Sequence, residues 1–313
     1  MKTIVTIGGG TGSYTMLRGL KNYTSSLEAV VSMADDGGSS GELRDEFGVL
    51  PPGDVRRCLI ALADDSKSDI FRRLFEYRFD GKNQRHNLGN LIMVALESIK
   101  GSPVLAIKEA ERILNITGSV LPVTIDDTTL YAELENGDVI KGESNISYQK
   151  INSKIKILWS EPPAFIYRET QEALENAGMI VICPGDLYGS IIPNFLVKGA
   201  AEAIRNSHAK KVFVCNLATK KYVEDFTAKD FFREIEKHLG KNVLDYAVVN
   251  TKRPSEDVVK KYESEGLSFV EPDIEDSYYK VIKGEFLAEV KSEFKTIARH
   301  DQQKLAKAIM SLV

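Results

Sequence analysis

The sequence predicts an α/β protein with a Rossmann-like, mostly parallel sheet, a helical cluster and an antiparallel β insertion. Three observations lead to this prediction. Short apolar runs alternate with helical periodicity near both ends of the chain, a glycine-rich loop directly follows the first of these runs, and a central stretch changes to a period of two.

The N-terminal segment predicts a βαβ unit. Residues 3–7 and 28–34 are short apolar runs, and Leu17 and Leu20 lie at helical spacing between them. A right-handed crossover makes the two strands parallel neighbours, with a crevice at their carboxyl ends.

The middle of the chain departs from strand–helix alternation. From about residue 53 to 115 the pattern is helical, with Val55, Leu59 and Leu62 on one face. Between about 120 and 161 it alternates, and Asn136-Gly137 predicts a tight hairpin. Continuous apolar strands return at 179–183, 211–215 and 246–250. We therefore expect one domain over residues 1–313, with a helical subregion and a β insertion in these ranges.

Composition excludes several classes of function. The chain has 313 residues, is 43% hydrophobic and carries a formal net charge of -4, which argues against a broad basic surface for nucleic acid. The N-terminus does not resemble a signal peptide, and no stretch reaches the roughly 20 apolar residues that span a bilayer. Three separated cysteines indicate a reducing compartment, and four histidines without paired spacing predict no structural zinc. We expect a cytoplasmic protein.

The first candidate site is the loop Gly8-Gly9-Gly10-Thr11-Gly12, which lies between a strand and a helix. Backbone N–H groups of Gly9, Gly10, Thr11 and Gly12 at a helix N-terminus suit a phosphate, although a tight turn would need the same glycines. No Lys-Ser or Lys-Thr follows Gly12, so this is not a Walker A loop, and Ser13 stands where a dinucleotide fingerprint has its third glycine.

A second loop follows the second strand. Asp35 lies 25 residues after Gly10, where dinucleotide folds place an acidic residue on a ribose hydroxyl. Asp35 and Asp36 together also suit a divalent metal such as Mg²⁺. Ser39 and Ser40 in the following Gly-Gly-Ser-Ser-Gly run could join an anion nest or cap a helix.

Three further segments are candidates. Asn87 and Asn90 share one face at a helix start, where their amides could contact a ligand or cap the helix, and the sequence does not decide between these. The loop from Gly185 to Asn194, with Ser190 near the next helix, is another phosphate candidate. We interpret Asp54 as a helix cap, and Arg56 and Arg57 as surface charges.

Taken in order, these loops resemble the YvcK family, bacterial proteins often labelled gluconeogenesis factor and related to the 2-phospho-L-lactate transferase CofD. The resemblance rests on segments spread from residue 3 to Arg299-His300-Asp301: Ile7–Gly12, Ala34–Gly41, Pro51–Arg56, Leu88–Leu91, Val120–Pro122, and Pro184-Gly185 with Leu187, Tyr188 and Ser190. Cys183, Asp186 and Gly189 depart from the more usual Gly, Ser and Thr of the last loop.

The resemblance implies a CofD-like fold, binding of a UDP-sugar such as UDP-N-acetylglucosamine, and a role in cell shape and cell-wall growth on gluconeogenic carbon sources. It also places the glycine loop, Asp35, Asp36 and the 185–194 loop around a nucleotide. Two hypotheses follow: a regulator that binds a UDP-sugar and signals through a protein partner, or a CofD-like, Mg²⁺-dependent transferase that acts on a nucleotide diphosphate. An NAD-dependent dehydrogenase ranks last because of Ser13. The sequence is compatible with a homo-oligomer.

Overall fold

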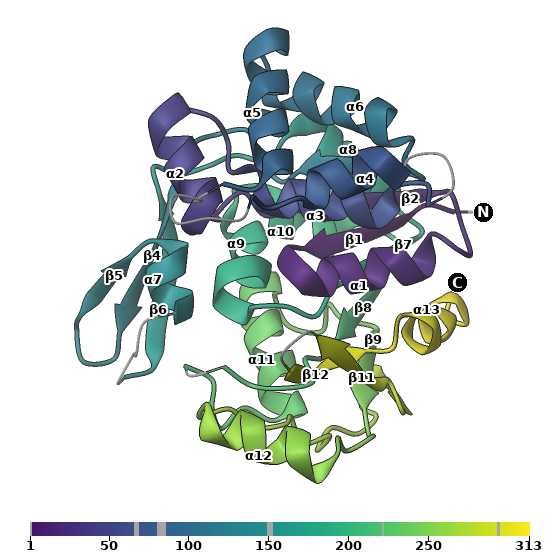
Figure 1. Cartoon of the computed structure of the whole chain (residues 1–313). Helices are drawn as coiled ribbons and strands as arrows, with labels where there is room; N and C mark the ends of the chain where they lie inside the picture. The colour runs from purple at the N-terminus through teal and green to yellow at the C-terminus, as the bar shows by residue number, and fades with distance from the viewer. Residues whose placement is uncertain (1, 66–68, 80–85, 149–152, 221, 293–294) are drawn as a thin grey trace.

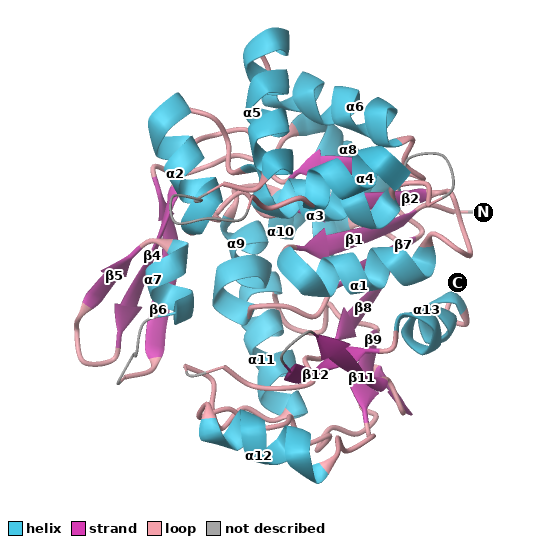
Figure 2. Cartoon of the chain, viewed as in Figure 1, coloured by secondary structure: helices cyan, strands magenta, loops and turns pink. Residues whose placement is uncertain are grey.

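The computed structural model describes residues 2–65, 69–79, 86–148, 153–220, 222–292 and 295–313. Its centre is a seven-stranded sheet in the order β10-β9-β8-β7-β1-β2-β3, in which all paired strands are parallel. The strands are β1 (Ile4–Gly8), β2 (Leu27–Val31), β3 (Ser119–Pro122), β7 (Met179–Ile182), β8 (Lys210–Val214), β9 (Tyr246–Asn250) and β10 (Lys280–Gly284). The predicted fold class is confirmed (Figures 1 and 2).

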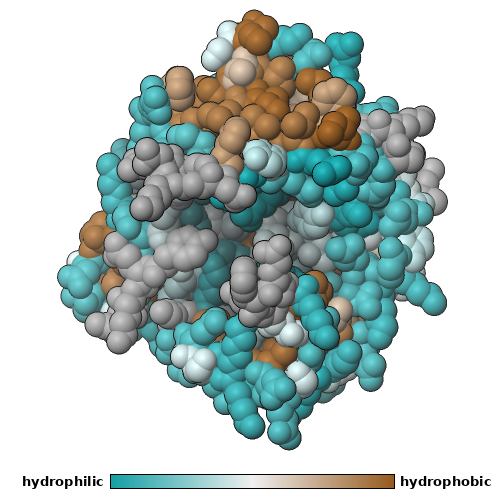
Figure 3. Space-filling model, in the orientation of Figure 1, coloured by the Kyte–Doolittle hydropathy of each residue, from teal (hydrophilic) through white to brown (hydrophobic). Residues whose placement is uncertain are grey.

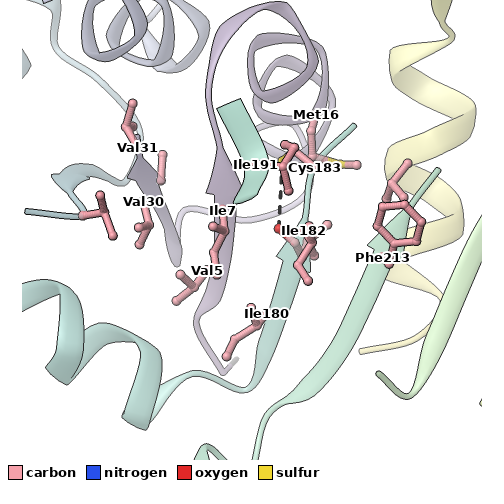
Figure 4. Packing of buried hydrophobic residues seen from close by; sticks show 14 of the residues in the cluster. Val5, Ile7, Met16, Val30, Val31, Ile180, Ile182, Cys183, Ile191 and Phe213 are labelled. Atoms are coloured by element: carbon pink, nitrogen blue, oxygen red, sulfur yellow. Dashed lines mark hydrogen bonds between the residues drawn. The ribbon is translucent and has the colours of Figure 1, made fainter. Parts of the chain in front are cut away.

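The central strands are continuous apolar runs because both faces of the sheet are covered by helices. Every residue of β1 and β7 is buried. Figure 4 shows Val5, Ile7, Ile180 and Ile182 packed within this core, and the Cys183 amide donates to the Ile7 carbonyl at 2.9 Å. Adjacent strands are thereby held in register up to the point where their loops begin.

Chain direction places the helices on two sides of the sheet. Helices between β1 and β3 pack together, as α1 (Gly10–Leu20) does on α3 (Pro52–Leu62). After β3 the chain crosses to the other side of β1 and adds the strands from β7 to β10 in the opposite direction. Right-handed crossovers therefore put the helices of this part of the chain on the opposite face of the sheet. The helices of this second group are α8 (Arg168–Asn176), α9 (Ile192–Leu196), α10 (Ala200–Asn206) and α11 (Ala228–Leu239), with the π-helical turn η1 at Leu187–Ile191.

The chain from residue 38 to 114 forms a helical cluster over β2 and β3. Besides α3 it contains α2 (Gly38–Phe47), α4 (Asp69–Glu76), α5 (Leu88–Lys100) and α6 (Pro103–Leu114). Asn87 and Ser102 cap α5 and α6 with their side chains. Helical periodicity predicted this cluster from about residue 53, and the structure adds α2, which lies before that bound.

A three-stranded antiparallel sheet projects from the side of the molecule (Figure 1). It consists of β4 (Thr129–Leu134), β5 (Val139–Lys141) and β6 (Ile155–Glu161), with the short helix α7 (Glu143–Tyr148) packed on it. Burial alternates along β4, as the period of two predicted. The expected insertion range also includes β3, but that strand pairs with β2 in the large sheet.

The C-terminal segment returns to the core. The hairpin of β11 (Leu287–Ser292) and β12 (Lys295–His300) follows α12 (Glu256–Ser264) and leads into α13 (Gln302–Met310). Helix α13 packs on α1, where a Cβ at Gly19 would lie 2.3 Å from the Gln302 carbonyl oxygen. Within the described residues no helix is long and apolar enough to cross a membrane.

Candidate functional site

A cleft of about 380 Å³ opens at the carboxyl ends of the parallel strands. It lies beside β1, where the strand order reverses between β7 on one side and β2 on the other. Open α/β sheets bind ligands at this switch point. The lining includes Gly9–Gly12, Asp35, Asp54, Arg57, Glu143, Gly185, Asp186, Ser190, Asn216, Lys220, Arg299 and His300.

The glycine loop forms one wall and is packed tightly from two sides. Gly10 starts α1 with φ +65°, in the left-handed region. A Cβ at Gly12 would lie 1.6 Å from the Pro184 carbonyl oxygen, and one at Gly9 would lie 2.2 Å from Oδ2 of Asp54. Glycine at Gly9 and Gly12 is thus required by neighbouring protein atoms, whatever ligand the loop also binds.

Asp54 is a central acidic group of the cleft rather than a simple helix cap. It is buried in the first turn of α3, and its carboxylate interacts with the Gly10 N–H. Burial, followed by repulsion from Asp35, raises its pKa to about 6, while Arg57 acts in the opposite direction. The glycine loop therefore already faces a carboxylate of the protein, and an anionic ligand entering here would meet that charge.

Asp36 attaches the insertion to the main sheet. Its Oδ1 accepts from the Ser144 N–H and Oγ, both at 2.8 Å, and its Oδ2 accepts from the Glu143 N–H at 3.0 Å. These bonds satisfy the first amides of α7, whose free N–H groups favour a carboxylate. The two adjacent aspartates thus differ: Asp35 faces the cleft, and Asp36 holds α7.

Glu143 is carried into the cleft by this attachment. Its Oε1 accepts from Ser147 Oγ at 2.6 Å, and a Cβ at Gly189 would come within 2.2 Å of the same oxygen. Burial is the main cause that raises the Glu143 pKa to about 8, and the charges of Asp186, Asp35 and Asp36 act in the same direction. At neutral pH Glu143 is mostly protonated and can donate a hydrogen bond to a ligand.

The loop after β7 packs directly beside the glycine loop and extends the same wall. Asn216, just beyond β8, pins it with both amide atoms: the Gly185 N–H donates to Oδ1 at 2.9 Å, and Nδ2 donates to the Gly185 carbonyl at 2.7 Å. Asp186 accepts from the Gly189 N–H and from the side chains of Lys220 and Tyr222. These contacts preorganise the loop before any ligand arrives.

Arg299 and His300 reach the cleft from the end of β12, far away in the sequence. Burial lowers the His300 pKa to about 4, so its imidazole is neutral at pH 7. Arg299 adds positive charge near the cleft without being part of the Rossmann-like core.

A second cavity of about 230 Å³ lies behind the glycine loop and shares Thr11 and Arg57 with the cleft. Arg56 and Arg78 also line it. Burial, then repulsion from Arg57 and Arg78, lowers the Arg56 pKa to about 10. Three arginines and one glutamate, Glu76, thus line this basic cavity, whereas the cleft brings together three cations and four acidic side chains.

Several predicted ligand residues lie outside the cleft because they bond to one another. Nε of Arg56 donates to Asn90 Oδ1 at 2.7 Å, and Asn90 Nδ2 donates to Ser39 Oγ at 3.0 Å. Asn87 accepts from the Asn90 N–H at 3.3 Å as the cap of α5, although it also lines the basic cavity. The structure therefore does not bring these three polar side chains into the cleft, and their hydrogen bonds join α2, α3 and α5.

Other predicted residues support the loops from beneath. Ser40 is buried against Gly53, and Leu187 and Tyr188 belong to the hydrophobic core. Asn194 is buried and donates to the Ser190 carbonyl at 2.8 Å. Of the predicted ligand residues, the structure brings together Gly9, Gly10, Thr11, Gly12, Asp35, Gly185 and Ser190 around one cleft.

The sequence analysis did not predict several residues of the cleft, and only some of them have a sequence feature that could have indicated them. Asn216 follows an apolar strand, so the rule that ligands bind at the carboxyl ends of strands could have found it. Glu143 follows a hairpin with no chemical motif around it. The sequence interpretation of Arg57 as a surface charge is incomplete, because Arg57 lines both the cleft and the basic cavity.

Within the described part of the chain, no group of three or more His, Cys, Asp or Glu side chains is arranged as a metal site. Asp35 and Asp54 nevertheless face the same cleft, and repulsion from Asp35 contributes to the raised pKa of Asp54. A divalent cation bound between them would relieve this repulsion, with the ligand or water completing its shell.

Fold and cleft together define a class: a doubly wound α/β protein with its cleft at the topological switch point. The chain belongs to the CofD family, since the family model described as 2-phospho-L-lactate transferase CofD matches residues 4–287. The resemblance found in the sequence is thereby confirmed.

Full-length relatives extend the assignment. The chain is 44% identical to a putative gluconeogenesis factor of Thermotoga maritima over 98% of both chains. It is 36% identical to the gluconeogenesis factor of Bacillus subtilis, covering 99% of this chain and 98% of the relative. A crystal structure of a UPF0052 family protein from Bacillus halodurans matches with a TM-score of 0.89 and 37% identity, covering 99% of this chain and 98% of the other.

Proposed function

We propose that this protein is a cytoplasmic regulator that binds a UDP-sugar of the UDP-N-acetylglucosamine kind in the cleft. The observation that carries the proposal is the meeting of two backbone loops, Gly9–Gly12 and Pro184–Ser190, in one cavity with the cations of Arg57, Lys220 and Arg299. Backbone amides and cations are the groups that bind a diphosphate. A cavity of about 380 Å³ is within the usual range for small-ligand sites.

The family suggests a wider role. Relatives over the full chain are called gluconeogenesis factors. We propose that this chain supports cell shape and cell-wall growth on gluconeogenic carbon sources. A regulator needs a surface that reports whether the cleft is filled. The insertion is suited to this task because α7 contacts the cleft with Glu143 and the projecting sheet with its other residues.

The acidic groups of the cleft lead to an expectation about Mg²⁺. Asp35, Asp54 and Asp186 would repel a diphosphate, so binding should improve when Mg²⁺ neutralises part of that charge. Protonated Glu143 would instead donate to a hydroxyl or carbonyl of the ligand. We expect stronger binding with Mg²⁺, and weaker binding as the pH rises through about 8.

The test is calorimetric titration of the purified protein with UDP-N-acetylglucosamine, GDP and NAD, each with and without Mg²⁺. Heat with the UDP-sugar, together with recovery of unchanged ligand, supports the regulator. No heat and no thermal shift at millimolar UDP-sugar would reject it.

In the presence of Mg²⁺, Asp35→Asn should weaken UDP-sugar binding about tenfold or more, because it removes a charge that faces the metal or ribose. Asp45→Asn is the matched control, since this side chain on α2 is 74% exposed. Equal affinity of Asp35→Asn and the control would show that Asp35 does not contact the ligand or its metal.

A second candidate function is a Mg²⁺-dependent transferase of the CofD kind, and the pairing of Asp35 with Asp54 favours it. Two carboxylates that hold a cation against a diphosphate can position a phosphoryl group for attack by an acceptor hydroxyl. Mg²⁺-dependent release of a nucleoside monophosphate would support this function. Intact nucleotide after prolonged incubation with candidate acceptors would count against it.

A further inference from the structure

The helical cluster has two unlike sides. In Figure 3 hydrophobic side chains gather at the top of the view, over α5 and its neighbours, and the surface below them is mainly hydrophilic. The side toward the glycine loop instead carries the basic cavity, between α1, α3, α4 and the start of α5. Arg56 and Arg57 on α3 and Arg78 after α4 converge on this space of about 230 Å³.

The protein does not match the positive charge of the basic cavity. Arg57 and Arg78 make no hydrogen bond or ion pair with any residue that the structure describes. Among the described residues of the lining, Glu76 is the only acid, and its carboxylate pairs at 3.4 Å with Arg72, which does not line the cavity. Three arginines and one glutamate leave this lining with a formal charge of +2.

Arg56 is positioned before any ligand binds. Only 6% of this residue is exposed, its Nε donates to Asn90 Oδ1 at 2.7 Å, and its Nη1 donates to the Phe75 carbonyl at 2.9 Å. Its Nη2 makes no hydrogen bond to a described residue and remains available at the cavity that Arg56 lines. An anion beside it would offset the repulsion from Arg57 and Arg78.

Two hydroxyl groups add donors to the same lining. Tyr14 and Thr11 both line the cavity, and neither hydroxyl bonds to another residue in the described part of the chain. Burial is the main cause that raises the Tyr14 pKa, so its hydroxyl keeps its proton and can donate. The lining therefore suits a ligand with several acceptor oxygens and about two negative charges.

We propose that the basic cavity is a second ligand site, which binds a phosphate dianion, either as inorganic phosphate or on a small metabolite. A phosphate group offers three acceptor oxygens and a charge of about -1.5 to -2, and arginine binds its oxygens in pairs. A carboxylate offers two oxygens and a single charge. The cavity is smaller than the roughly 300 Å³ at which sites for drug-sized ligands begin, so a second nucleotide does not suit it.

The site is coupled to the cleft because Arg57 and Thr11 line both spaces. Arg57 also acts on Asp54 of the cleft, whose pKa it lowers. A phosphate that engages Arg57 takes a cation away from the cleft and adds negative charge beside the glycine loop. This consequence rests on the proposed function: bound phosphate should weaken UDP-sugar binding about fivefold, and the UDP-sugar should weaken phosphate binding by the same factor.

Calorimetric titration of the full chain with inorganic phosphate and with glycerol 3-phosphate, at constant ionic strength and without nucleotide, tests the site itself. We expect one phosphate group bound per chain, and acetate bound at least about tenfold more weakly because it carries a single charge. Arg78→Gln should weaken phosphate binding about tenfold, since it removes charge-assisted hydrogen bonds. Arg73→Gln is the matched control, because this exposed arginine on α4 does not line the cavity.

The two phosphate probes identify the source of the ligand. Tighter binding of glycerol 3-phosphate indicates a phosphate ester, and tighter binding of inorganic phosphate indicates the free ion. No binding of either probe at millimolar concentration, an equal affinity for acetate, or wild-type affinity in Arg78→Gln would each overturn the proposal. Phosphate binding that Arg78→Gln weakens supports the site even if the UDP-sugar gives no heat, so the proposed function can fail separately.

Titration of the UDP-sugar at increasing phosphate concentration tests the coupling. The loss of UDP-sugar affinity should reach a plateau once the basic cavity is filled, because two distinct sites have a finite coupling. Arg78→Gln should shift this plateau to higher phosphate concentration, and Arg73→Gln should not. A loss that grows without limit would place the phosphate in the cleft and overturn the second site.

Discussion

The two walls of the cleft are built in different ways. The sheet wall consists of loops fixed directly to buried parallel strands, with Gly12 packed on Pro184 and Asn216 bonded to Gly185. The insertion wall is Glu143 on a six-residue helix, attached to the sheet through Asp36. The sheet wall is rigid because close packing defines it, whereas the insertion wall depends on a few charge-assisted hydrogen bonds.

The largest effect is expected on the sheet wall. Gly12→Ala places a Cβ 1.6 Å from the Pro184 backbone oxygen, and neither α1 nor the pinned loop can move away cheaply. We expect a loss of roughly 4 kcal/mol or more in the free energy of unfolding, at the upper end for single substitutions. Urea unfolding measures it.

Gly137→Asn is the control for that substitution. Its φ of +89° favours glycine, unlike the φ of Gly12, but nothing lies within 4 Å of a Cβ there, and Asn tolerates this region better than other residues. Its cost should stay near 1 kcal/mol. Equal losses in the two variants would mean that the glycine loop is not held by packing.

The second effect compares the buried acids of the two walls through pH. Because the Glu143 pKa is raised, the folded chain keeps a proton that the unfolded chain loses, so stability falls as pH rises from about 4.5 to about 8. Glu143→Gln should therefore be more stable than wild type by about 3 kcal/mol at pH 7, with the gain vanishing near pH 4.5.

Asp54→Asn provides the counterpart on the sheet wall. Its gain in the free energy of unfolding over wild type should develop between about pH 4 and pH 6 and stay constant above pH 6, because the Asp54 pKa is about 6. Denaturant unfolding at a series of pH values measures both profiles. A Glu143→Gln gain that is independent of pH would contradict the assignment of a raised pKa to Glu143.

The smallest effect concerns the attachment of the insertion. Asp36→Asn removes the negative charge of the carboxylate that accepts hydrogen bonds from the Ser144 and Glu143 N–H groups. It should lower the free energy of unfolding by about 2 kcal/mol. The loss should be local, so hydrogen exchange should quicken in α7 while β1 and β7 keep their protection. Asp45→Asn should change neither. Unaltered exchange in α7 would mean that other contacts hold the insertion.

Local pattern predicted most of the architecture but only part of the site. Continuous apolar runs indicated the strands β1 and β7, because both faces of these strands are buried. Alternation of apolar and polar residues indicated β4, because one face of this strand is buried. The sequence does not decide whether Asn87 and Asn90 contact a ligand or cap a helix, because both roles require the same amide at a helix start. Their bonds to each other and to Arg56 depend on packing.

Strand period, helix spacing and glycine placement are local properties of the chain, so the α/β class, the family and the position of the glycine loop at a strand end could be predicted from the sequence. Which charges share the cleft could be learned from the folded structure alone. It brought Asp54 to Gly10, separated Asp36 from Asp35, and delivered Glu143 from the insertion and Arg299 from the last hairpin. These juxtapositions depend on long-range packing, which no spacing along the chain records.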